Sequence, residues 1–120
     1  GYDPLYAEVF EKNNSAYVGK GAAISKYTGA RGKSGSNDAN AEYLGILRKA
    51  FDDAKVEYQT AELGRIDAGG GGTIAYIPAA YGMDVIDIGV PILNMHAPYE
   101  VSSKADVYET TKCYKAFYEM

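Results

Sequence analysis

A run of four glycines and the only histidine of the chain are the residues that could do chemistry. The glycines occupy positions 69–72 and stand directly before a segment with helical character, 73–81. A glycine loop that opens a helix presents free backbone N–H groups and the positive end of the helix dipole, so it can receive an anion. His96 follows a β-branched and apolar run, 84–90, which predicts a strand buried on both faces. Open α/β sheets bind ligands beyond the carboxyl ends of their strands, so both features point to a site.

Each feature also has a simpler explanation. Neutral imidazole is the commonest metal ligand, but zinc needs three or four donors, and a single histidine is more often a structural or surface residue. Glu100, four residues after His96, could orient the imidazole as the carboxylate behind a metal ligand. The glycines are explained equally well by tight packing of the loop against a strand. These residues alone therefore leave the nature of the site open.

Composition restricts the class of protein. The 120 residues suffice for one domain, and the net charge of −4 argues against nucleic acid as the main partner. No apolar run approaches the roughly 20 residues needed to span a bilayer, and no signal-peptide pattern is present, so we expect no membrane association. The single cysteine, Cys113, cannot form an internal disulfide, which fits a reducing compartment and predicts a cytoplasmic protein. Its place in an amphipathic segment predicts a packed thiol rather than a nucleophile.

Strand and helix patterns alternate along the chain. Strands are predicted at 22–28 (which carries Lys26), 56–63 and 84–90, and helices at 73–81, at 104–118 and after a cap at Asn37 or Asp38, with a short helix at 5–12. This order predicts an α/β fold whose sheet is parallel, mixed at most, with helices packed on it. Right-handed parallel connections would then place His96 and the start of the 73–81 helix at the same end of the sheet.

The inward faces of the two long helices follow from apolar spacing. The first helix is predicted to bury Leu44, Leu47, Phe51 and Ala54. In the last helix, Ser103 and Asp106 resemble a capping box, and the predicted inward stripe is Val107, Thr111, Tyr114 and Phe117 or Tyr118.

The loop at 29–36 resembles the end of a phosphate-binding loop. Gly32, Lys33 and Ser34 match the last residues of GxxxxGKS, but the first glycine of that motif would be Tyr27. Without this glycine the tight turn around the phosphates is not available, so we interpret the segment as a solvated loop.

The segment 67–100 resembles the C-terminal part of the dinuclear zinc aminopeptidases of the aspartyl aminopeptidase and vacuolar aminopeptidase I family. That family has a glycine–threonine helix start, a D-x-G strand and an M-H-x-x-x-E motif. They are matched here by Gly72-Thr73, by Asp87-Ile88-Gly89, and by Met95-His96 followed by Glu100. Further matches at Lys20-Gly21, Lys26 and Ser36-Asn37 extend the resemblance over essentially the whole chain.

The resemblance implies a role for several residues. It implies that His96 is a zinc ligand and that Lys26 contacts substrate; Gly71 and Gly72 are candidates for binding a substrate carboxylate or oxyanion through their N–H groups. The family's aspartate ligand would fall just before Gly1, and its remaining ligands and glutamate base further upstream. We therefore expect residues 1–120 to be the C-terminal portion of a metallopeptidase catalytic domain, a fragment of the larger zinc-exopeptidase α/β sandwich with no catalytic residue of its own.

The implied enzyme hydrolyses N-terminal residues from peptides with two zinc ions. Its partners would be a peptide substrate, the remainder of the catalytic domain and, as in the family, further copies in a homo-oligomer. This chain alone should be inactive, because one imidazole cannot replace three or more ligands. The alternative is a non-catalytic small α/β module with an anion-binding glycine loop.

Overall fold

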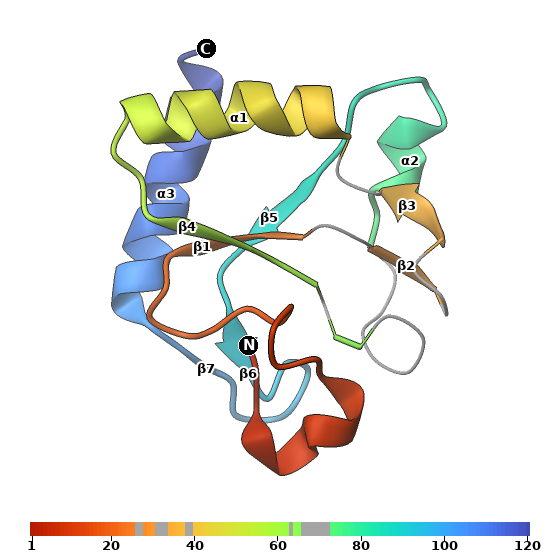
Figure 1. Ribbon diagram of the computed structural model, residues 1–120, viewed down its shortest axis with the longest axis vertical. Coiled ribbons are helices and arrows are strands. Elements are labelled where there is room, and N and C mark those ends of the chain that lie inside the picture. The colour runs from red at the N-terminus through yellow and green to blue at the C-terminus, as the bar shows by residue number, and fades with distance from the viewer. Residues whose placement is uncertain (26–27, 31–33, 38–39, 63, 66–72) are drawn as a thin grey trace.

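The computed structural model describes residues 1–25, 28–30, 34–37, 40–62, 64–65 and 73–120. Within these residues a 3-10 helix, η1, comes first, and three α-helices and seven short strands follow (Figure 1). Their bounds are η1 Pro4–Val9, β1 Ala22–Ser25, β2 Thr28–Ala30, β3 Ser34–Asn37, α1 Ala41–Asp53, β4 Tyr58–Ala61, α2 Tyr76–Ala79, β5 Asp87–Gly89, β6 Ile92–Leu93, β7 Val101–Ser102 and α3 Lys104–Tyr118.

The central sheet is mixed, with the strand order β4-β1-β5. β1 and β4 are parallel, with Ala22 opposite Tyr58, and β5 is antiparallel to β1, with Ile24 opposite Ile88. The α/β class with a sheet that is mixed at most is confirmed, but the expectation of an all-parallel sheet is wrong for β5. In the described part of the connection between β4 and β5, the helix α2 has only four residues, which is too short for a crossover that returns the chain along the sheet.

This reversal changes where the predicted site features lie. Thr73, at the start of the predicted 73–81 helix, bonds to Asp87, the first residue of β5, whereas His96 follows the last residue of that strand. The all-parallel sheet from which this expectation followed is not formed, although Thr73 and His96 both line the cavity described below. β5 is also half-buried rather than buried on both faces, because it is an edge strand among the described residues.

The hydrophobic core lies between the sheet and helices α1 and α3. The buried residues that form it come from β1, both helices and the segment after α1: Ala22, Ile24, Leu47, Phe51, Val56, Cys113 and Ala116. The predicted inward face of α1 is confirmed at Leu47 and Phe51, while Ala54 is exposed because it is the residue that ends the helix.

The sequence analysis placed the start of α1 too early in the chain, after a cap at Asn37 or Asp38. Asn37 pairs with Thr28 in the β2–β3 hairpin, so the segment 29–36 is partly strand rather than a simple loop, and the helix begins after it. The cap is Asn40, whose side chain accepts hydrogen bonds from the backbone N–H groups of Glu42 and Tyr43, each at 3.0 Å.

Helix α3 packs through small side chains. Its buried residues are Asp106, Thr110, Cys113 and Ala116, so the predicted inward stripe is wrong. Val107 and Tyr114, which were expected to face the core, are 46% and 47% exposed. Small residues let the helix lie close to β1, and the larger apolar residues are left on the outer side.

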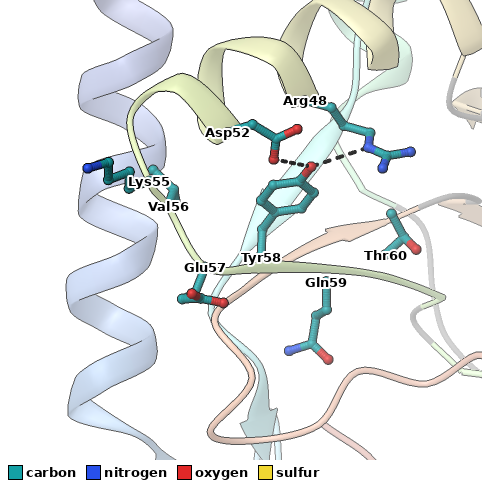
Figure 2. Close-up of a pocket in the computed structure, with 8 residues that line it drawn as sticks. All are labelled: Arg48, Asp52, Lys55, Val56, Glu57, Tyr58, Gln59 and Thr60. Atoms are coloured by element: carbon teal, nitrogen blue, oxygen red, sulfur yellow. Dashed lines mark hydrogen bonds between the residues drawn. The ribbon is translucent and has the colours of Figure 1, made fainter.

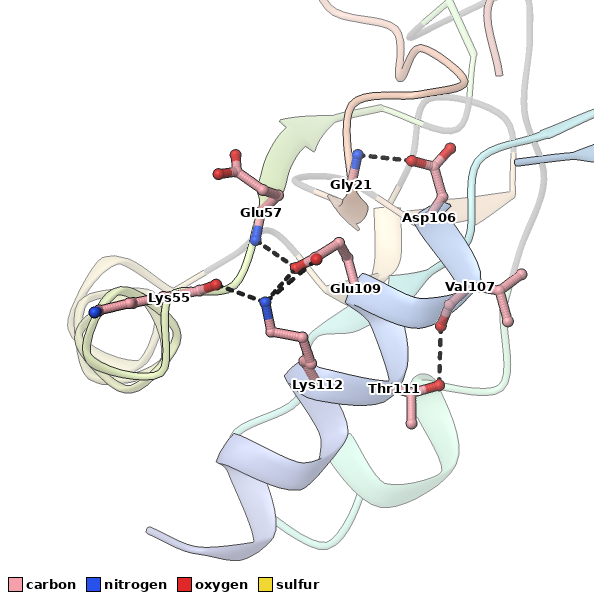
Figure 3. A network of polar contacts seen from close by, with 8 residues as sticks. All are labelled: Gly21, Lys55, Glu57, Asp106, Val107, Glu109, Thr111 and Lys112. Carbon is pink, nitrogen blue, oxygen red and sulfur yellow. Dashed lines mark hydrogen bonds and ion pairs between the residues drawn. The ribbon is translucent and has the colours of Figure 1, made fainter. Parts of the chain in front are cut away.

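Three side chains of α3 make four hydrogen bonds to the segments that lead into β1 and β4, and Figure 3 draws three of the four. The buried carboxylate of Asp106 accepts hydrogen bonds from the backbone N–H groups of Gly19 (2.6 Å) and Gly21 (2.8 Å), just before β1. Glu109 accepts one from the backbone N–H of Glu57 at 2.8 Å, and Lys112 donates to the carbonyl of Lys55 at 2.6 Å. The start of β1 and the α1–β4 connection are therefore both held to the same helix.

Cys113 is a packed thiol, as predicted, with 1% of its surface exposed. Burial, and then the charge of Glu109, raise the pKa of the Cys113 thiol to about 11. Since only the thiolate is nucleophilic, we expect Cys113 in the native protein to resist iodoacetamide at neutral pH and to react promptly in denaturant. Mass spectrometry of the peptide that contains Cys113 measures this, and rapid stoichiometric modification of the native protein would contradict it.

Candidate functional site

His96 lies on the loop of a small hairpin. Strands β6 and β7 pair antiparallel, with Ile92 opposite Ser102 and Leu93 opposite Val101, and residues 94–100 connect them. The sequence analysis predicted the strand before His96 but not this hairpin. Two-residue strands leave too short a pattern to read from the sequence.

The loop holds His96 in an unusual backbone conformation. The φ angle of His96 is +68° and that of Asn94 is +56°, both in the left-handed region that side chains with a Cβ seldom adopt. The backbone N–H of Ala97 bonds to the carbonyl of Asn94 at 2.9 Å. The backbone N–H of His96 donates to a carboxylate oxygen of Glu100 at 2.5 Å. The side chain of His96 is thus exposed, and hydrogen bonds within the loop hold the backbone of the loop in place.

A cavity of about 730 Å³ lies beside this loop. Its walls come from the N-terminal segment, the ends of β1 and β4, β5 with the residues that follow it, and the loop that carries His96. The side chains there that could bind a cation or a polar substrate are Asp3, Glu62, Asp87 and His96. The sequence analysis named Asp87 only as the first residue of the D-x-G motif and did not single out Asp3 or Glu62, since isolated carboxylates carry no recognisable spacing.

Thr73 also lines this cavity and links two of its walls. Its hydroxyl donates to a carboxylate oxygen of Asp87 at 3.2 Å and accepts from the backbone N–H of Ala75 at 3.2 Å. The chain that follows the glycine run is thereby tied to the start of β5. Gly71, Gly72 and Lys26 lie outside the described residues, so their predicted roles in substrate binding remain predictions.

A second hollow, about 620 Å³, runs beside β4 and the C-terminal half of α1 (Figure 2). There the Tyr58 hydroxyl donates to Asp52 at 2.9 Å and accepts from the Arg48 guanidinium at 3.2 Å. These polar groups satisfy one another, and none of the lining residues is a histidine or a cysteine. The cavity beside His96 is the better candidate for a functional site.

The described residues do not fit a zinc centre by themselves. Imidazole is a donor that zinc prefers, but among the parts of the chain that the structure covers no group of three histidine, cysteine, aspartate or glutamate residues is arranged to hold a metal. His96 can supply one such donor, and a zinc centre there would need further donors.

Within those same parts, no helix combines the length and the apolar character that crossing a lipid bilayer requires.

Known proteins resemble this chain over almost its whole length. Residues 1–118 match the model of the family described as aminopeptidase I zinc metalloprotease (M18). The chain is 64% identical over 116 residues to a probable M18 family aminopeptidase 1 of Clostridium acetobutylicum, covering 97% of this chain and 25% of the relative. It is 48% identical over 117 residues to the protein of the same name from Thermotoga maritima, covering 98% and 26%.

Solved structures agree with this result. The crystal structure of aminopeptidase I from Clostridium acetobutylicum superimposes with a TM-score of 0.90 at 63% identity, over 98% of this chain and 26% of the other. The M18 aminopeptidase from Thermotoga maritima gives a TM-score of 0.87 at 48% identity, over 95% and 25%. The chain thus spans about a quarter of the length of these relatives. Because the family model matches residues 1–118, the chain belongs to the M18 family of zinc metalloprotease aminopeptidases.

Proposed function

We propose that the complete protein containing this chain is a zinc aminopeptidase that hydrolyses N-terminal residues from peptides, and that residues 1–120 are the C-terminal portion of its catalytic domain. The main support is the position of His96, the histidine of the family motif, on a constrained loop beside the cavity where β1, β4 and β5 meet. The family match over residues 1–118 favours this function over a non-catalytic module with an anion-binding glycine loop.

In this proposal His96 supplies one ligand to a centre of two divalent metals. Bound zinc in such a centre polarises the scissile carbonyl and lowers the pKa of a water molecule. Lys26 and the backbone N–H groups at Gly71 and Gly72 contact the substrate, and Glu100 supports His96. The general base and the remaining ligands belong to the rest of the catalytic domain.

Exposed apolar residues support contacts with partners. Ile74, Tyr81 and Tyr118 are 77%, 79% and 83% exposed, and exposed apolar surface can mark a site of protein–protein contact. We assign these surfaces to contacts with the remainder of the catalytic domain and with other copies in a homo-oligomer. The buried free thiol of Cys113 is consistent with a cytoplasmic location.

Removal of the metal tests the proposed activity. The complete protein should cleave aminoacyl chromogenic substrates and should not cleave peptides whose N-terminus is acetylated. Dialysis against a strong chelator should abolish turnover and added zinc should restore it, with dialysis in plain buffer as the control. Undiminished turnover by metal-free protein would contradict the proposal, as would the absence of turnover of any aminoacyl substrate by zinc-loaded protein.

A further inference from the structure

We propose that Glu100 is a positioning residue that acts on the backbone of His96 and not on its imidazole. The inference rests on the proposed role of His96 as a metal ligand. It assigns to Glu100 the task of holding the loop 94–100 in the conformation that presents the imidazole to the cavity.

The loop needs such a restraint because its backbone is disfavoured. His96 and Asn94 both have positive φ angles, +68° and +56°, within three residues of one another. Residues with a Cβ keep this conformation only where the surrounding structure imposes it. The bond from the Ala97 N–H to the Asn94 carbonyl closes one turn of the loop but does not involve the backbone N–H of His96.

Glu100 provides the missing restraint. Its carboxylate accepts the hydrogen bond from the His96 N–H at 2.5 Å, and a bond with an ionised acceptor is stronger than one between neutral groups. The next residue, Val101, pairs with Leu93 in the hairpin, so the backbone of Glu100 is itself anchored. Within the described part of the chain, the Glu100 carboxylate makes no ion pair with the His96 imidazole.

The restraint raises the metal affinity by raising the fraction of molecules whose loop is already in the metal-binding conformation. If the loop moves among several conformations, only the fraction with the imidazole directed at the cavity binds metal, and the apparent affinity falls by that fraction. Glu100 keeps this fraction high before the metal arrives. A carboxylate that instead acted by its charge on the imidazole would raise the basicity of the ligand.

Three substitutions in the complete protein separate these two roles. Glu100→Gln keeps the length of the side chain and a carbonyl acceptor but removes the charge. Glu100→Asp keeps the charge but is one methylene shorter, and Glu100→Ala removes both. We expect the zinc affinity of Glu100→Gln to stay within about threefold of wild type, and that of the other two to fall roughly 10–100-fold. If Asp preserves affinity and Gln does not, or if Gln and Ala behave alike, the inference is overturned.

Hydrogen exchange of the metal-free protein gives a readout that does not depend on activity. The His96 amide should exchange at least about tenfold faster in the Ala and Asp variants than in wild type, and no more than about threefold faster in Gln, which keeps the acceptor but loses its charge. Glu119→Ala, which removes an exposed glutamate at the end of α3, should change neither the exchange nor the zinc affinity. Unchanged exchange at His96 in Glu100→Ala would overturn the inference.

The two proposals fail in different ways. If replacing His96 leaves bound zinc unchanged, the role of His96 as a ligand is wrong, although the exchange experiment can still show that Glu100 restrains the loop. If replacing His96 removes the zinc while every Glu100 variant retains wild-type affinity and exchange, only the positioning role is wrong.

Discussion

Replacing His96 with glycine should remove nearly all aminopeptidase activity from the complete protein while leaving its fold intact. Glycine adopts positive φ angles without penalty, so the substitution relaxes the backbone at φ +68° instead of straining it. The loss can then be attributed to the imidazole. Losing a partner behind a metal ligand costs about 10–100-fold, so losing the ligand itself should lower kcat/KM by more than about 100-fold. Bound zinc, measured by elemental analysis, should fall with it.

Two further variants control for the backbone. His96→Asn also tolerates the left-handed region and lacks the imidazole, so it should match His96→Gly. Lys55→Gly makes the same kind of change at another residue with positive φ (+53°), away from the cavity beside His96, and should leave turnover unchanged. Normal zinc content and turnover in His96→Gly would show that His96 is a surface histidine.

Replacing Gly21 with alanine should have the largest effect on stability. A Cβ at Gly21 would lie 2.1 Å from the carbonyl oxygen of Glu57 and 2.5 Å from its carbonyl carbon, at a φ angle of +83°. Both obstacles are backbone atoms, so no side chain can rotate away. We expect the free energy of unfolding to fall by about 3–5 kcal/mol, which combines overpacking with left-handed strain. Denaturant unfolding of the complete protein, followed by the reactivity of Cys113, measures the change.

Gly19→Ala is the matched control for this prediction. Gly19 has a similar φ angle of +88° and also donates its N–H to Asp106, but a Cβ there would meet no atom within 4 Å. It should therefore lose only about 1 kcal/mol from the unfavourable φ angle. Equal losses in the two variants would show that the close approach of Gly21 to Glu57 is unimportant.

Local patterns in the sequence predicted the elements better than their arrangement. The spacing of Leu47 and Phe51 gave the buried face of α1 correctly, and Ser103 does begin α3. The direction of β5 depends on the path between β4 and β5, and the described residues of that path form only the four-residue helix α2. No periodicity in the strand itself encodes that path.

The inward face of α3 was misjudged for a different reason. Hydrophobicity alone favours Val107 and Tyr114 over Cys113 and Ala116, because it cannot distinguish a face that packs on this sheet from one that packs on other parts of a larger protein. The role of Asp106 was also missed. Its position in a capping box suggested a contact within its own helix, whereas its carboxylate binds the backbone before β1.

The candidate site was only partly predictable. The family motif identified His96 and Glu100, but the left-handed backbone of His96 and the bond from its N–H to Glu100 depend on the hairpin of β6 and β7. A four-residue spacing in the sequence does not tell whether a carboxylate meets an imidazole or a peptide N–H. That difference decides what each substitution at Glu100 should do.

The most direct test of the account is to locate the metal. Crystals of the complete protein, grown with zinc, should show anomalous scattering at the zinc absorption edge, with a peak at coordination distance, about 2.0–2.1 Å, from an imidazole nitrogen of His96. The same measurement on His96→Gly should show a peak that is lost or much weaker. Zinc bound at full occupancy elsewhere in an active enzyme, with no imidazole nitrogen of His96 in contact with it, would contradict the proposed role of this chain.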